Sequence, residues 1–183
     1  MNRLHTILIL AAIFVAVFFE AWFDGFRDVF GVQIDFLPAL MVYTGVTNGC
    51  FTIVLAAVCG GLWFDSFSAN PLGVSVLPLL VIGLLAHRGR ELLSSEHPAA
   101  QFFLGAVASA LQPLAALFIL LNLGELPLLG WKSLWQWAVM AVGGGLFTPV
   151  CFALFDRFHQ AFDYQPVNKS SFRPDREIKR GRV

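Results

Sequence analysis

The stretch that decides the fold is FLPALMVYTGVTNGCFTIVLAAVCGGLWF, residues 36–64. As one helix, these roughly 29 apolar residues would extend about 43 Å, well beyond the roughly 30 Å hydrocarbon core of a bilayer. Small and polar residues interrupt the stretch from Thr44 to Gly49. The stretch is therefore either one long tilted helix or a hairpin of two short helices that turns at residues 47–49.

The basic residues favour the hairpin, because Lys and Arg near the ends of spans collect on the cytoplasmic side of a membrane. With a hairpin the chain has six spans, and only Arg27 and Lys132 lie outside. The cytoplasmic side then holds Arg3, Arg88, Arg90, Arg157, Lys169, Arg173, Arg176, Lys179, Arg180 and Arg182. With five spans and a cytoplasmic N-terminus, only Arg3 and Lys132 would be cytoplasmic. We therefore predict six spans with both termini in the cytoplasm.

The composition agrees with a membrane protein, since 57% of the residues are hydrophobic and 13% are charged, against roughly 25% charged in soluble domains. We predict an all-α integral membrane protein, a compact bundle of six transmembrane helices within residues 1–163, two or three of them short. The expected spans cover residues 4–23, 34–47, 49–64, 72–86, 102–123 and 134–155. Residues 164–183 are polar and basic, which predicts a disordered cytoplasmic tail.

The sequence contains no pattern typical of catalysis. Lys plus Arg and Asp plus Glu are equal at 12 each, so no basic field indicates nucleic acid as a partner. The three cysteines lie inside apolar runs, and the four histidines do not occur in a metal-ligand spacing. We expect a protein that is not an enzyme and has no metal and no cofactor.

Asp65 closes an apolar run and precedes Ser66 and the segment Asn70, Pro71, Leu72, Gly73. A carboxylate at the end of a span is costly to bury without partners. In one interpretation Asp65 accepts hydrogen bonds from Ser66, Ser68 and the amides that open the next helix. Asn70 would then cap that helix, and Pro71 would lie in its first turn. In the other, Asp65 shapes an outward-facing pocket or docking surface.

Four further residues are candidates. Glu20 lies near the outer end of the first span, and Gln112 lies in the middle of the fifth, where polar side chains normally face protein. We expect the side chains of Glu20 and Gln112 either to form hydrogen bonds between helices or to line an interior cavity. Arg88 and Arg90 follow the fourth span, as a topology anchor or a contact for a cytoplasmic partner.

The order of features between Asp35 and Arg90 resembles the MreD family, the rod shape-determining membrane proteins of bacteria. The shared features are Asp35, the run from Pro38 to Tyr43, a tight turn, the Gly-rich helix ending in Leu62 to Asp65, the segment Asn70 to Gly73, and the basic pair Arg88 and Arg90. The turn departs from the family, whose members commonly carry basic residues there.

The resemblance implies a non-enzymatic subunit of the cell-elongation machinery in the bacterial inner membrane. It implies that the chain binds MreC within and outside the membrane. It also implies coupling of cytoplasmic MreB filaments to RodA and its penicillin-binding transpeptidase.

The six-span layout of this chain also resembles a second class of protein. This class is the substrate-binding S component of an energy-coupling-factor vitamin transporter, which is likewise a bundle of six helices. Ala12 and Ala16 match the small-residue contact that such components present from their first helix. In that case Asp65 or the Trp-rich outer loop could line a vitamin pocket. An intramembrane enzyme or channel would need a buried reactive constellation, which the sequence does not indicate.

Overall fold

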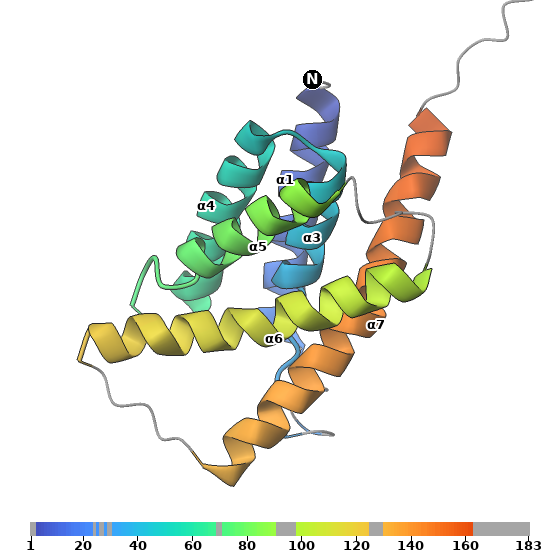
Figure 1. Ribbon diagram of the computed structural model, residues 1–183. Coiled ribbons are helices and arrows are strands. Elements are labelled where there is room, and N and C mark those ends of the chain that lie inside the picture. Colours follow the sequence, from blue (N-terminus) through green and yellow to red (C-terminus); the bar gives the residue numbers. More distant parts are fainter. Residues whose placement is uncertain are drawn as a thin grey trace, which may run out of the picture.

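The computed structural model describes residues 3–23, 25, 28, 31–68, 71–90, 98–124 and 130–162. Every regular element in this part of the chain is a helix, so the all-helical prediction is confirmed. The six helices are α1 (Arg3–Trp22), α3 (Leu37–Thr47), α4 (Cys50–Phe67), α5 (Val76–Gly89), α6 (Pro98–Asn122) and α7 (Trp131–Phe162), shown in Figure 1. The predicted tail, residues 164–183, lies outside the described residues.

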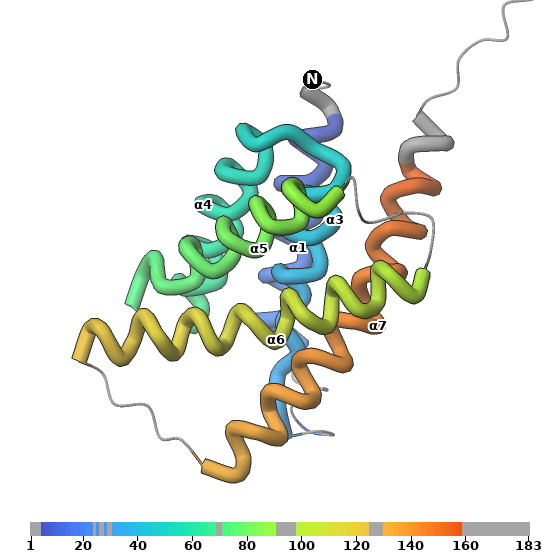
Figure 2. Tube along the Cα trace, in the orientation of Figure 1, coloured from blue at the N-terminus to red at the C-terminus, as the bar shows by residue number. Residues whose placement is uncertain are grey.

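The apolar stretch at residues 36–64 forms two helices, as its length and charge pattern predicted. α3 ends at Thr47 and α4 begins at Cys50. Between them the backbone is extended at Asn48 and Gly49, and the Asn48 N–H donates to the Thr44 carbonyl at 2.9 Å. Figure 2 shows the chain reversing direction at this turn.

Four helices, α1, α4, α6 and α7, are long and apolar enough to cross a membrane. Their outward faces carry large apolar side chains, among them Val15 at 63% exposure and Phe118 at 69%. Such surfaces are suited to lipid rather than to water. α3 and α5 would extend only about 17 and 21 Å, less than the roughly 30 Å core. α3 is shielded instead, since its residues 37–45 are all buried.

The fourth expected span begins later than residue 72. Residues 72–75 form a turn in which Gly73 has a φ of +94°, and α5 begins at Val76 with Ser75 as its N-cap. The expectation that Pro71 lies in the first turn of this helix is wrong, because the left-handed backbone at Gly73 separates the two. α6 begins before the expected residue 102, and α7 extends beyond residues 134–155 at both ends.

The bundle has two ends. At the hairpin end, which contains residues 47–49, His5 Nε2 lies 3.2 Å from Asn48 Nδ2 and His87 Nδ1 lies 3.1 Å from the Gly45 carbonyl oxygen. α1 begins and α7 ends toward this side (Figure 1). At the other end, called the acidic end here, lie Glu20, Asp35 and Asp65, each buried.

Close contacts between helices hold these ends in place. Gly105 and Gly144 mark the crossing of α6 and α7, where an added Cβ on Gly144 would collide with the Ser109 hydroxyl. Tyr43 of α3 packs between two aromatic rings of α7, 5.1 Å from Phe152 and 4.4 Å from Phe155 between ring centroids. Both contacts bring α7 against the central helices.

Candidate functional site

Asp35 begins the candidate site because its carboxylate accepts a backbone N–H at the start of α3. Its Oδ1 accepts the Leu37 N–H at 2.9 Å, one of the amide groups that a helix N-terminus leaves without an intrahelical partner. The next residue, Pro38, has no N–H to satisfy and suits this first turn. Asp35 is only 2% exposed. The hydrogen bond at the start of α3 therefore holds the Asp35 carboxylate inside the protein.

Gln112 reaches the same carboxylate from α6. Its Nε2 donates to Asp35 Oδ2, so each Asp35 oxygen has one donor. Gln112 is buried, and its Oε1 has no hydrogen-bond partner among the described residues. The polar residue in the middle of α6 thus faces protein, as expected for a side chain at this depth.

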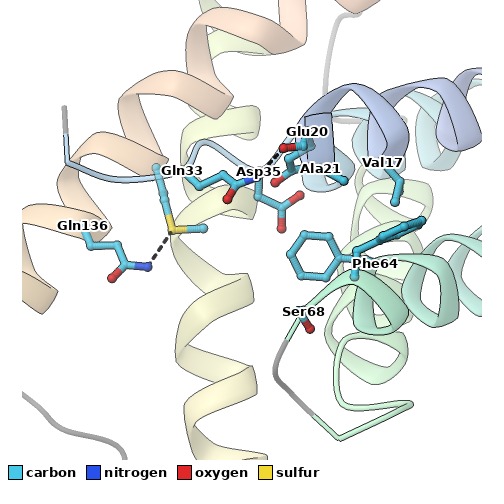
Figure 3. A pocket seen from close by; sticks show the side chains of 10 residues that line it. Val17, Glu20, Ala21, Gln33, Asp35, Phe64, Ser68 and Gln136 are labelled. Atoms are coloured by element: carbon cyan, nitrogen blue, oxygen red, sulfur yellow. Dashed lines mark hydrogen bonds between the residues drawn. The ribbon is translucent and has the colours of Figure 1, made fainter. Parts of the chain in front are cut away.

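Glu20 approaches Asp35 from α1. The Glu20 side chain is 5% exposed, and its Oε2 has no hydrogen-bond partner in the described part of the chain. Its backbone carbonyl accepts from Gln33 Nε2 at 2.6 Å, which ties the segment before α3 to the end of α1. The two carboxyl groups interact electrostatically, and Figure 3 shows them facing the same space.

This space is a cavity of about 360 Å³ at the acidic end. Its polar lining comes from Glu20, Gln33, Asp35, Ser68 and Gln136. Its apolar lining comes from Val17, Ala21, Phe64, Phe67 and Met140 (Figure 3). Sequence reasoning identified only the two acids in this set. Gln33 lies only two residues before Asp35 in the sequence, whereas Gln136 lies between Trp135 and Trp137, far along the chain from both acids.

Asp65 lies near the C-terminal end of α4, beside this cavity. Its Oδ2 accepts the Gly73 N–H at 2.7 Å and the Ser75 N–H at 3.1 Å. Asp65 is 2% exposed and is not among the residues that line the cavity. The exposed Ser66 donates to the Leu62 carbonyl at 2.7 Å. The carboxylate therefore holds the turn that leads into α5.

The remaining candidates lie elsewhere. Arg88 and Arg90 are exposed at the hairpin end, far along α5 from Asp65. Asn70 lies outside the described residues. The structure thus brings Glu20, Asp35 and Gln112 together, places Asp65 at the nearby end of α4, and separates the two arginines from both sites.

A second concave feature lies on the side of the bundle, where α1 faces α7. This lateral groove has a volume of about 470 Å³. Its lining is apolar and includes Ala11, Ala12 and Ala16 of α1 with Phe147, Leu154 and Phe158 of α7. Small residues let the backbone of another helix approach closely within a membrane. The groove can therefore accept a transmembrane helix or a lipid chain.

Among the described residues, no group of three His, Cys, Asp or Glu side chains could hold a metal ion. Comparisons of the chain with models of protein families, with curated proteins and with solved structures found no match.

Proposed function

We propose that this chain is a non-enzymatic membrane subunit of the bacterial cell-elongation machinery, which holds MreC and the peptidoglycan synthases together in the inner membrane. RodA and its penicillin-binding transpeptidase would be the synthases, and MreB the cytoplasmic partner. The proposal begins from the resemblance between residues 35–90 and the MreD family. Both termini and the exposed Arg88 and Arg90 would then face the cytoplasm.

The observation that carries the proposal is the lateral groove between α1 and α7. Its lining is apolar, and three alanines of α1 leave room for a helix to pack closely. Ala11 is exposed within it, whereas Ala12 and Ala16 are partly buried against the core. In our proposal the membrane segment of MreC packs into this groove.

Ala11→Trp tests the groove directly, because an indole at this position would occupy the space of a docked helix. We expect the wild-type protein to retain MreC during purification in detergent and Ala11→Trp to lose most of it. Val54→Trp is the matched control, since Val54 is 45% exposed on α4 and does not line the groove. Equal retention by both variants would exclude the groove, and failure of the wild type to retain MreC would exclude the elongation machinery.

A second candidate function is the S component of a vitamin transporter of the energy-coupling-factor type. The observation that favours it is the polar cavity at the acidic end, which has room for a small molecule. Such a component would purify with its ATPase module or with a bound vitamin instead of MreC. The same purification therefore discriminates between the two functions.

A further inference from the structure

We propose that the cavity at the acidic end binds a cationic group, an ammonium or a guanidinium, against the carboxylates of Glu20 and Asp35. This inference goes beyond the scaffold role and does not depend on which partner occupies the lateral groove.

The first step is the Glu20 carboxylate, which receives a hydrogen bond from the Phe36 backbone N–H but has one oxygen, Oε2, without a partner among the described residues. A buried charged group without a partner is strongly unfavourable, and most buried polar atoms in proteins have one. Glu20 is 5% exposed, and its Oε2 has none among the described residues, although the residue lines an accessible cavity. The missing partner is therefore expected to come from outside the described chain.

The second step is the sign of the charge. Asp35 already accepts one donor at each oxygen, from Leu37 and from Gln112. These donors are neutral, so they do not cancel the charge of a second acid beside it. Among the described residues that line the cavity there is no Lys, Arg or His. A cation in the cavity would relieve the repulsion between the two carboxylates and give Glu20 Oε2 a donor.

The third step is the size and the walls of the cavity. About 360 Å³ is far larger than a bare metal ion needs, and the described residues contain no three-ligand group for a metal. Phe64, Phe67 and Met140 supply apolar and aromatic walls beside the acids. An organic cation suits such walls, because aromatic faces attract ammonium and guanidinium groups. Water could fill the space but would bring no positive charge to the two acids.

The experiment uses the full-length protein in lipid nanodiscs and isothermal titration calorimetry at millimolar probe concentrations. The probes are methylguanidinium and methylammonium, and N-methylurea is the neutral isostere of the first. We expect the cations to bind and N-methylurea not to bind. Glu20→Gln keeps the shape of the side chain and should weaken cation binding about ten- to a hundredfold, the loss expected for a charged hydrogen bond.

Asp156→Asn is the matched control, because it also removes one carboxylate, from an exposed position of α7 outside the cavity. It should bind the cations as the wild type does. Gln33→Lys is a second variant that places an ammonium on the cavity wall. It should raise the melting temperature and abolish probe binding, because the site is then filled from within the chain.

The group could belong to a free small molecule or to a Lys or Arg side chain of a partner. Native mass spectrometry of the protein from its own membranes distinguishes them: a small adduct present in the wild type and absent from Glu20→Gln indicates a free ligand. Probe binding that depends on Glu20, without such an adduct, indicates a partner side chain. Equal binding of N-methylurea, equal binding by Glu20→Gln, or no cation binding at all would overturn the proposal.

Discussion

Replacing Asp65 with alanine should destabilise the protein without blocking its insertion into the membrane. The carboxylate is 2% exposed and accepts two backbone N–H groups, from Gly73 at 2.7 Å and from Ser75 at 3.1 Å. In Asp65→Ala both amides lose their acceptor at the start of α5. The turn of residues 72–75 would then have no side chain holding it to the end of α4.

The size of the loss follows from these two bonds. Hydrogen bonds to a charged group contribute about 1.5–3 kcal/mol each, so the two together contribute roughly 3–6 kcal/mol. The variant no longer has to bury a carboxylate, which offsets part of this loss. We expect a net destabilisation of about 3 kcal/mol. For a chain of this length that corresponds to a fall in melting temperature of roughly 6–12 °C.

The assay is thermal unfolding of the purified protein in detergent, followed by the loss of monodisperse protein on heating. Asp65→Asn keeps one acceptor oxygen for the same amides and should lose about half as much stability. Ser66→Ala is the control: its exposed hydroxyl bonds only within α4, to Leu62, so its effect should stay within about 0.5 kcal/mol.

Partner retention separates this role from a docking role. If Asp65→Ala melts at the same temperature as Ser66→Ala but no longer retains MreC, then the carboxylate contacts a partner and the structural reasoning is refuted. If it melts lower and still retains MreC below its melting temperature, the carboxylate acts by holding the turn.

Three further predictions concern backbone space and topology. Gly45→Ala should destabilise by about 1–2 kcal/mol, because the new Cβ would lie 2.5 Å from a backbone oxygen of α5; Gly49→Ala, with no atom within 4 Å, should cost less in the same melting assay. Gly73→Ala should cost about 1–2 kcal/mol because its φ is +94°, whereas Gly73→Asn should recover part of the loss, since Asn tolerates this conformation. In a cysteine-free background, membrane-impermeant reagents should label Arg88→Cys and Lys132→Cys from opposite sides of the membrane; labelling of both from one side would refute the predicted topology.

The hairpin could be predicted because two independent constraints agreed. The stretch at residues 36–64 is too long for one span, and only a reversal places Arg88 on the same side as most of the other basic residues. The exact ends of the helices were harder to predict from the sequence. The position of α5 depends on the left-handed backbone at Gly73, and a glycine in a sequence shows only that such a conformation is possible.

The sequence named Ser66, Ser68 and the amides that open the next helix as possible partners of Asp65, but could not decide among them. In the structure Asp65 Oδ2 accepts from the backbone amides of Gly73 and Ser75. Those amides return to the end of α4 only because the turn folds back on it. Sequence neighbours identify possible donors, whereas the turn geometry determines which of them lie within hydrogen-bonding distance.

The sequence also could not show that Glu20, Asp35 and Gln112 meet. These residues come from three separate segments, and only helix packing brings them together. The three buried acids at this end of the bundle differ in the hydrogen-bond donors that their carboxylates receive. Asp65 has two backbone donors, and Asp35 has one backbone and one side-chain donor. Glu20 Oε2 has none among the described residues. Asp65 Oδ1 also has no partner among the described residues, but Asp65 does not line the cavity, and the Glu20 carboxylate does receive the Phe36 backbone N–H. Of the three acids, Glu20 is the one that both lines the cavity and keeps an oxygen without a partner among the described residues, so a bound cation has the most to contribute there.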